Sequence, residues 1–365
     1  MKKQANVLVT GATGFIGTHL VYQLSQRGFR VRALCRRNRL EPIPGKPTAS
    51  HPLKARNVQL VRGDVTDRGS LDRALEGCDY VFHVAGLAQQ WQKDASNYYR
   101  VNVDGVENIL TAAETAKVKK TVVTSTIVTF GPTEKSQVGD ESMPRNTEAY
   151  FTEYEKSKAM GEQVALSFAQ RGAPITIVNP TRVFGPGYLN DGNSVTKLID
   201  DYDRGRFPFL LNGGANVGNY VFVDDVVDGH ILAMQKGKVG ERYILGSENI
   251  SLKGFFEVVA RLKGKKTFQM SATMIPKMVA WGYQKRADWF SIAPQISPGW
   301  LNTFLADWSF DCDKARRQLG YCPMPLNEAI HRTYRWVVGL RKQSRIPKAV
   351  PAISTWQSSN VRSAT

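Results

Sequence analysis

The stretch TGATGFIG, residues 10–17, places three glycines (Gly11, Gly14 and Gly17) directly after the short apolar run NVLVT. The run predicts a buried strand, and the residues that follow, to about Arg27, predict a helix. Between them, one glycine would permit a tight turn, another would let the backbone approach a pyrophosphate, and the third would let the helix pack on the strand. The helix N-terminus would face the phosphates. The stretch therefore predicts a dinucleotide-binding turn.

Strand and helix signals alternate through the first half of the chain. Further strands are predicted in RVRALC, VQLVRGD, YVFHVAG, KTVVTST and ITIVNP. Helices are predicted in SLDRALEG, where Ser70 could be the cap, from about Tyr98 to Ala116, and from about Tyr150 to Gln170. Such alternation is typical of a parallel sheet covered on both faces. We therefore expect an α/β fold with a Rossmann-type doubly wound parallel sheet.

The alternation ends after Phe184, where glycine-rich loops and irregular helical patterns begin. We expect residues 1–180 to form the NAD(P)-binding Rossmann domain, with later crossovers at about 214–235. Residues 181–340 are expected to form mainly a smaller, mixed α/β substrate-binding domain. Residues 341–365 predict a flexible basic tail, and the proline-rich residues 38–57 predict a surface loop.

The charge of the chain is strongly positive, +17 at pH 7 over 365 residues. Such a field favours phosphorylated ligands, anionic membrane surfaces or nucleic acid. No aromatic-rich RNA-binding motif is present, so we expect no nucleic acid partner. The N-terminal apolar run is too short for a signal peptide, and no run approaches the length of a membrane helix, so a cytoplasmic protein is expected. The four cysteines lack CxxC spacing, and no metal site is expected.

The end of the second predicted strand, ALCRRNR, bears on the choice of dinucleotide. Cys35 stands where an acidic residue would bind the ribose hydroxyls of NAD. Arg36 and Arg37 follow, and guanidinium groups suit a 2′-phosphate, although a solvated basic turn is the alternative. We therefore expect NADP to be preferred, with NAD as the alternative. Asp64 at the third strand end would lie near an adenine, or would instead cap the following loop.

Eight motifs occur in one order along the chain: TGATGFIG, GDVTD, FHVAG, VNVDG, VVTST, YEKSK, NPTRVFGPG and YVFVDDVVDGH. Over residues 5–337 the chain thereby resembles the extended short-chain dehydrogenase/reductase superfamily. It is most similar to the dihydroflavonol-reductase-like and 3β-hydroxysteroid-dehydrogenase-like branch. The resemblance implies that Tyr154 is the catalytic acid and Lys158 its helper. It also implies a catalytic hydroxyl at Thr126, with Ser125 as the neighbouring alternative.

The resemblance implies roles for other residues as well. Asn102 is expected to fix backbone near the catalytic strand, and Asp224 and Asp225 to cap a helix. His83 and His230 are expected to be structural. The expected cofactor-binding residues are Gly11, Thr13, Gly14, Phe15, Ile16, Gly17, Arg36, Arg37, Asp64, Val65, Ala85, Gly86, Lys158, Pro180 and Val183.

The chemistry explains why a catalytic tyrosine would have a lysine four residues later. A free tyrosine has a pKa of about 10, and a lysine cation and the positive ring of an oxidised nicotinamide would both lower it. The Thr126 hydroxyl would hold the substrate oxygen. Hydride would then pass to the carbonyl carbon while Tyr154 protonates the oxygen.

Three functions compete. The first is NADPH-dependent reduction of a ketone, aldehyde or activated acyl group on a fairly apolar substrate, favoured by the arginines and by Trp281, Trp289, Trp300 and Trp308. The second is a nucleotide-sugar epimerase or dehydratase with bound NAD. The absence of an acid at Cys35, and of an acidic pair beside Thr126, counts against it. The third is a non-catalytic NADP-binding sensor or RNA-binding protein.

Two expectations concern partners besides a small-molecule substrate. The segment MIPKMVAWGYQKRADWF mixes aromatic residues with cations, which would suit peripheral contact with a membrane, and a substrate-pocket lining explains it equally well. A homodimer is expected only from the resemblance.

Overall fold

The computed structural model describes residues 5–37, 40–45, 51–89, 91–145, 149–206, 209–264, 270–271, 274–290, 292–294 and 297–342. Of the predicted basic tail, residues 343–365 lie outside the described residues. So do residues 38–39 and 46–50 of the predicted proline-rich loop.

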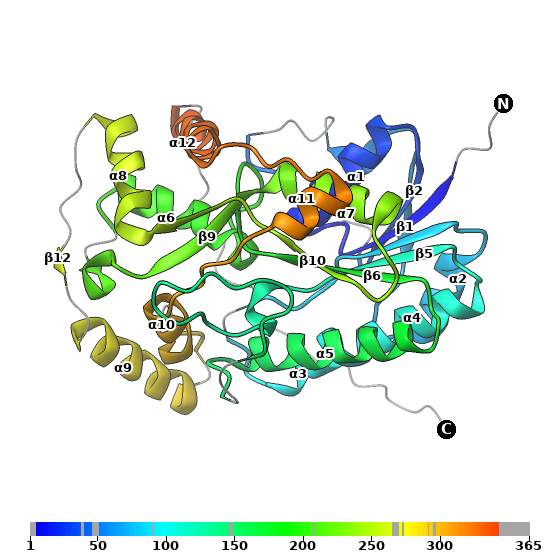
Figure 1. Ribbon diagram of the computed structural model, residues 1–365, viewed down its shortest axis with the longest axis horizontal. Helices are drawn as coiled ribbons and strands as arrows, with labels where there is room; N and C mark the ends of the chain where they lie inside the picture. Colours follow the sequence, from blue (N-terminus) through cyan, green and yellow to red (C-terminus); the bar gives the residue numbers. More distant parts are fainter. Residues whose placement is uncertain are drawn as a thin grey trace, which may run out of the picture.

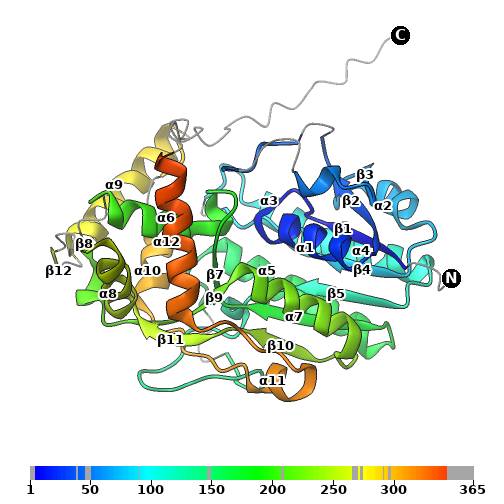
Figure 2. The ribbon, with the colours of Figure 1, turned by 90° about the horizontal axis from the view of Figure 1, so that it is seen from above.

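Seven parallel strands form the large sheet, in the order β10-β6-β5-β4-β1-β2-β3 (Figures 1 and 2). The predicted Rossmann-type doubly wound sheet is thereby confirmed. β10 was not among the predicted strands, because its four residues, RYIL, give too short a pattern. The strands are β1 (Asn6–Thr10), β2 (Arg30–Cys35), β3 (Val58–Arg62), β4 (Tyr80–His83), β5 (Lys120–Thr124), β6 (Ile175–Pro180) and β10 (Arg242–Leu245).

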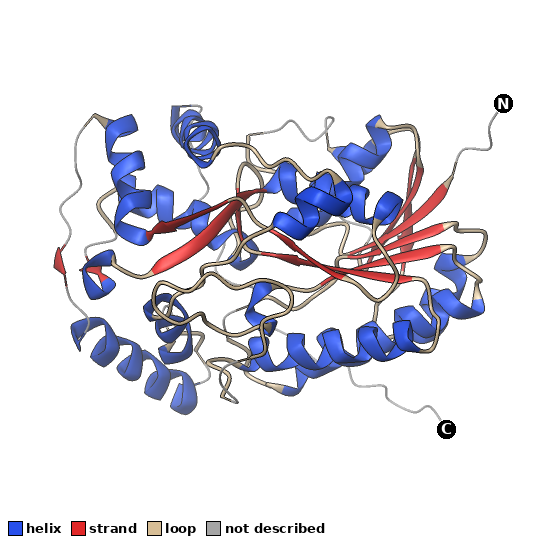
Figure 3. Ribbon diagram, viewed as in Figure 1, coloured by secondary structure: helices blue, strands red, loops and turns tan. Residues whose placement is uncertain are grey.

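Helices cover both faces of this sheet (Figure 3). Side chains alternate between the two faces of a strand, so Val7 and Val9 of β1 enter one core and Leu8 enters the other. The first core is shared with α1 (Phe15–Gln26), α7 (Val223–Lys236) and α11 (Asp313–Leu319). The second is shared with α2 (Arg68–Leu75), α4 (Gly105–Thr115) and α5 (Glu153–Gln170).

Two predicted helices differ in detail from the prediction. Asp67, not Ser70, caps α2, because its carboxylate accepts a hydrogen bond from the Ser70 N–H. The helix predicted from Tyr98 is divided into α3 (Ser96–Tyr99), a π-helical turn (Arg100–Asp104) and α4. The turn approaches α5 so closely that a Cβ on Gly161 would lie 2.0 Å from the Asn102 carbonyl oxygen.

A smaller group of elements packs beyond the carboxyl ends of the large sheet. It contains a three-stranded sheet of order β11-β9-β7 and a core of its own, to which α6, α8, α10 and α12 contribute. Its strands are β7 (Arg182–Phe184), β9 (Val217–Phe222) and β11 (Glu248–Ser251), and β8 (Phe209–Leu210) pairs with β12 (Met270–Ser271). Its helices are α6 (Ser194–Asp203), α8 (Leu252–Lys263), α9 (Met274–Phe290), α10 (Pro298–Leu305) and α12 (Leu326–Lys342).

Short 3₁₀ turns complete the structure at Pro52–Lys54, Ile127–Thr129, Asp191–Asn193 and Leu211–Gly214. A search of the described residues finds no helix long and apolar enough to cross a membrane. Among the same residues, no three His, Cys, Asp or Glu side chains gather in a way that could hold a metal ion.

Candidate active site

The glycine turn lies against the end of β4, at the point where the order of strands reverses. In open α/β sheets, ligands bind in the crevice at this point. Gly11 has φ +66°, and a Cβ there would lie 2.6 Å from the backbone nitrogen of Ala85. A Cβ on Gly17 would lie 2.1 Å from the Gly11 carbonyl oxygen. Both positions therefore require glycine, and the backbone between them stays bare.

The N-terminus of α1 opens onto this turn. Gly14 is its N-cap, no side chain caps it, and no acidic residue lies in its first turn. The first N–H groups of the helix therefore remain available for an anion. Thr13 is exposed beside them, whereas Phe15 is buried and Ile16 packs against the core. This turn fits the pyrophosphate of a dinucleotide, with Phe15 and Ile16 contributing through their backbone.

Arg36 and Arg37 follow β2 and are exposed, and neither forms an ion pair with another described residue.

Asp64, after β3, caps the following loop, which is one of the two roles that the sequence left open. Its Oδ1 accepts hydrogen bonds from the backbone N–H (2.9 Å) and the hydroxyl (3.0 Å) of Thr66. Val65 is buried against Gly105.

Tyr154, Lys158 and Thr126 come together at the carboxyl end of β5. Tyr154 and Lys158 lie one turn apart on α5, and Thr126 follows β5 by two residues. The Thr126 hydroxyl lies near the Tyr154 phenol, close enough to favour its ionised form. Lys158 is buried, and its Nζ donates to the carbonyl oxygen of Thr124 at 2.8 Å. The three residues that the sequence assigned to catalysis thus form one cluster.

Burial dominates the protonation of this cluster. It raises the pKa of Tyr154 to about 12, although the nearby Thr126 hydroxyl acts in the opposite direction. It lowers the pKa of Lys158 to about 8, although the nearby Glu162 carboxylate favours the cation. The lowered tyrosine pKa expected from the sequence is therefore not produced by the protein groups alone. They keep Tyr154 protonated, as a proton donor requires.

Ser125, the neighbouring alternative to Thr126, is arranged differently. Its side chain is buried, and its hydroxyl has no hydrogen-bond partner among the described residues. Its backbone N–H donates to Val178 at 2.8 Å, which continues the pairing of β5 with β6. Of the two hydroxyls, that of Thr126 acts on the pKa of Tyr154, whereas that of Ser125 has no partner among the described residues.

The floor of the site is made by the segment after β4. A Cβ on Gly86 would lie 3.9 Å from the Nζ of Lys158 and 3.4 Å from the Oδ1 of Asn102. Ala85 donates its N–H to the Thr10 hydroxyl at 3.2 Å. Asn102 accepts from the N–H of Leu87 at 2.8 Å, so it fixes this segment. Small residues at 85 and 86 thus bring the glycine turn and the catalytic helix to one crevice.

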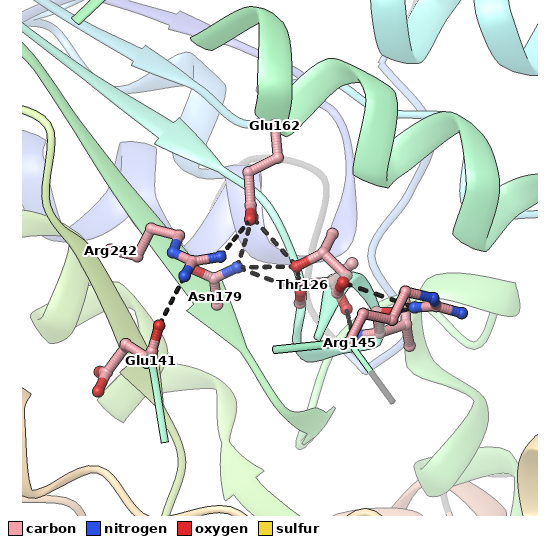
Figure 4. A network of polar contacts seen from close by, with 8 residues as sticks. Thr126, Glu141, Arg145, Glu162, Asn179 and Arg242 are labelled. Atoms are coloured by element: carbon pink, nitrogen blue, oxygen red, sulfur yellow. Dashed lines mark hydrogen bonds and ion pairs between the residues drawn. The ribbon is translucent and has the colours of Figure 1, made fainter. Parts of the chain in front are cut away.

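A polar network that the sequence did not reveal lies behind Thr126 (Figure 4). Asn179 of β6 donates to the carbonyl oxygen of Thr126 at 3.2 Å and to Glu162 at 2.6 Å. Arg242 of β10 contacts the other oxygen of Glu162 at 3.2 Å. Glu162 lies two turns after Tyr154 on α5, and is buried. The network ties three elements distant in sequence to the catalytic loop.

The match to a family model decides where this chain belongs. The model of the NAD dependent epimerase/dehydratase family matches residues 7–246. The chain belongs to this family. It is an enzyme of the extended short-chain dehydrogenase/reductase type and uses a nicotinamide dinucleotide.

Two curated relatives of this family member match most of its length. A protein of Synechocystis sp. described as "Putative dihydroflavonol 4-reductase" is 34% identical over 335 residues, which cover 90% of this chain and 93% of the relative. A 4-hydroxy-2-methyl-3-oxo-4-farnesyl-3,4-dihydroquinoline-1-oxide ketoreductase of Stigmatella aurantiaca is 29% identical, over 86% of this chain and 90% of the relative.

Solved structures of similar fold include gox2253, 31% identical with a TM-score of 0.74 over 92% of this chain and 98% of that one. Another is the dTDP-glucose 4,6-dehydratase DesIV of Streptomyces venezuelae, with NAD and TYD bound. It is 25% identical, with a TM-score of 0.73 over 93% of this chain and 98% of that one.

Pro180 and Val183, the last of the expected cofactor contacts, lie where β6 passes into the smaller sheet of this family member. Pro180 is buried and ends β6, while Val183 is half-buried in β7 beside Val221 of β9. Asp224 and Asp225 do not cap α7 with their side chains, so that expectation was wrong. Asp225 instead accepts from the N–H of Met324 at 3.0 Å, and Asp224 contacts His19 at 2.8 Å.

A cleft of about 570 Å³ lies at the start of α5. Residues 151–153, directly before Tyr154, line one side, Tyr98 of α3 lines another, and Ala287 of α9 a third. Its volume suits a drug-sized or larger ligand. The cleft therefore provides room for a substrate on the side of the site where α9 lies.

The four tryptophans do not form one pocket. Trp308 is buried in a core beside β10, and its indole N–H donates to Thr303 at 2.8 Å. Trp300 is half-buried against Phe304, while Trp281 and Trp289 point outward from α9. The tryptophans therefore do not indicate an apolar pocket, and the cleft at the start of α5 is lined by both apolar and polar residues.

Proposed function

We propose that the protein is an NADPH-dependent reductase of a ketone, aldehyde or activated acyl group on a fairly apolar substrate. The observation that carries the proposal is the gathering of Thr126, Tyr154 and Lys158: the Thr126 hydroxyl acts on the pKa of Tyr154, and the buried Lys158 lies one helical turn after Tyr154. A carbonyl oxygen placed beside both hydroxyls would meet a binding group and a proton donor at once.

The glycine turn, from Gly11 to Gly17, would hold the pyrophosphate, and Arg36 and Arg37 would bind the 2′-phosphate. Their exposure, without ion pairs to other described residues, supports NADPH over NADH. When bound, the reduced nicotinamide supplies the hydride that the carbonyl carbon receives.

The residues of the chain handle the proton. Thr126 orients the carbonyl oxygen by a hydrogen bond. Tyr154, protonated at neutral pH, gives its phenolic proton to that oxygen as the carbon–oxygen double bond is reduced to an alcohol. The Lys158 ammonium, still charged below pH 8, stabilises the phenolate that is left, until water restores the proton.

The apolar nature of the substrate has two supports. One is the set of apolar residues Trp91, Phe151 and Ala287 in the cleft at the start of α5, which polar and charged side chains also line. The other is the Stigmatella relative, whose name describes a ketoreductase acting on a farnesyl compound.

The test is to follow NADPH oxidation by the purified protein with a panel of apolar ketones, aldehydes and acyl thioesters. At least one class should be reduced, and Tyr154→Phe should lower kcat by about 10²–10⁴-fold, the usual contribution of a proton donor. Tyr150→Phe is the matched control and should leave kcat unchanged, because Tyr150 lies before the start of α5, with its ring under the Arg145 guanidinium.

One result would overturn the proposed reductase. A protein that copurifies with NAD and interconverts nucleotide sugars, without net consumption of NADPH, would overturn the reductase. The bound NAD of the DesIV structure makes this the second candidate.

A further inference from the structure

The helix α9 turns its large apolar side chains away from the protein. Met274, Trp281, Trp289 and Phe290 are exposed by 71%, 63%, 76% and 66%. Ile275, Met278 and Val279 are exposed on the same helix. In Figures 1 and 2 the helix lies at the edge of the molecule, with α10 beside it. Monomeric proteins rarely leave such a continuous apolar surface in water.

The inner face of α9 has the opposite composition. Its buried residues, Pro276, Ala280 and Ala287, are small. A helix that only packs on a core buries its largest apolar residues and exposes its polar ones. Here the order is reversed, so packing inside the protein does not explain why Trp281 and Trp289 are present.

Cations accompany the outer apolar face. Lys277, Lys285 and Arg286 are exposed on α9, against the single acid Asp288. The Lys285 ammonium lies 5.7 Å from the centre of the Trp281 ring. Tryptophan and lysine together suit the boundary between phospholipid head groups and acyl chains, because both have an apolar body and a polar end. The net charge of +17 adds attraction to an anionic surface.

We propose that α9 (its outer face defined by Met274, Met278, Trp281, Lys285, Trp289 and Phe290) docks in the plane of an anionic phospholipid bilayer. With 17 residues and three cations, the helix lies in the interface and does not cross it. The inference does not rest on the proposed function. It has a consequence for the site, because Gln284, Ala287 and Asp288 of the same helix line the cleft of about 570 Å³. Docking would bring that cleft to the surface in which apolar molecules dissolve.

The test is sedimentation of the full chain with vesicles, in about 0.1 M salt, where electrostatic attraction is only partly screened. Vesicles of phosphatidylcholine with about one third phosphatidylglycerol should bind the protein, and pure phosphatidylcholine vesicles should bind it about tenfold more weakly. The double variant Trp281→Ser/Trp289→Ser should lose binding by about tenfold or more. Its melting temperature should not change, because both side chains are exposed.

Two control variants test whether binding depends on α9 or on exposed apolar and basic side chains anywhere on the surface. Val138→Ser/Val239→Ser removes two exposed apolar side chains from other segments and should keep full binding. Lys277→Glu/Lys285→Glu should lose binding to the anionic vesicles, whereas Lys238→Glu/Lys253→Glu, with the same charge change elsewhere, should lose much less.

The proposal is wrong if the wild-type protein stays in the supernatant with anionic vesicles, or if the tryptophan variant binds them equally well. A third outcome also overturns it. If light scattering finds an oligomer that the tryptophan variant dissociates, and vesicles bind neither form, a second copy of the chain covers α9.

Discussion

The ammonium group of Lys158 on α5 lies 2.8 Å from the carbonyl oxygen of Thr124, the last residue of β5. The bond joins the catalytic helix to the strand that leads to Thr126, so one buried cation links the two elements that carry Tyr154 and Thr126. Burial lowers the pKa of this lysine to about 8, so its charge changes with pH near neutrality.

The charge of Lys158 should make kcat depend on pH. Because burial lowers the pKa of Lys158 to about 8, the cation that stabilises the Tyr154 phenolate is present below pH 8 and is lost above it. We expect kcat for carbonyl reduction to fall as pH rises through about 8, measured at saturating NADPH and substrate. A kcat that stays constant to pH 10 would contradict the role given to Lys158.

Glu162 is predicted to be a positioning residue. Its carboxylate favours the Lys158 cation, and it holds Asn179, which binds the Thr126 carbonyl. Glu162→Gln should therefore move the fall of kcat to lower pH, and should also reduce stability, because Arg242 loses its charged partner and keeps its hydrogen bond to the Glu141 carbonyl oxygen.

Glu141→Gln is the matched control for that pH profile. Glu141 is also buried and accepts from the N–H of Ile244 at 2.7 Å, but it does not act on Lys158. It should lower the melting temperature without moving the pH profile. Equal pH profiles for both variants would reduce Glu162 to a structural role.

Gly11→Ala should abolish dinucleotide binding. The added Cβ would meet the Ala85 backbone at 2.6 Å, and the positive φ would add strain of about 1 kcal/mol or more. Gly172→Ala is the control, since Gly172 has φ +95° but no atom within 4 Å of the added Cβ. It should cost similar stability and keep binding, as measured by NADPH fluorescence. Binding that survives Gly11→Ala would show that the crevice lies elsewhere.

The stability of the fold should fall in mild acid. Burial lowers the pKa of His83 to about 3 and that of His230 to about 4. Between these values and about 6.5, the unfolded chain binds protons that the folded chain does not, so the two histidines make stability decrease as pH decreases. Asp225, whose pKa burial raises to about 6, acts in the opposite direction and reduces this loss. We expect the melting temperature to fall from pH 6.5 toward pH 4.

A variant identifies the residue responsible. His230, whose Nε2 lies 2.8 Å from the Thr124 hydroxyl, can be replaced by glutamine, which does not titrate in this range. His230→Gln should lower stability at pH 7 but make the loss in acid less steep. Parallel curves for variant and wild type would assign the acid sensitivity to other groups.

Local patterns predicted much of this structure. The glycine turn, the alternation of strands and helices and the spacing of Tyr154 and Lys158 are features of neighbouring residues, and they led to the sheet and the catalytic helix. Contacts between distant residues were harder to predict. Glu162 and Asn179 meet only because α5 packs on β6, and Arg242 enters from a strand that the sequence did not reveal.

The sequence also did not reveal which face of α9 packs against the protein. Helical spacing says which residues of α9 share a face, but not which face turns inward. The tryptophans suggested a pocket lining because large apolar residues are usually buried. The structure instead buries Ala280 and Ala287 and exposes Trp281 and Trp289. The division of the helix at Arg100–Asp104 was similarly invisible, because a π-helical turn depends on what packs against it.

The central claim, an NADPH-dependent reductase, is tested most directly by fluorescence titration of NADPH and NADH into the purified protein, Arg36→Asp and Arg317→Asp. Arg317 lies on α11, beside β10 at the opposite edge of the sheet from β2, so it controls for the change in charge. We predict that the wild type and Arg317→Asp bind NADPH at least about tenfold more tightly than NADH, and that Arg36→Asp loses this difference. Tighter binding of NADH by the wild type, or an unchanged preference in Arg36→Asp, would contradict the account.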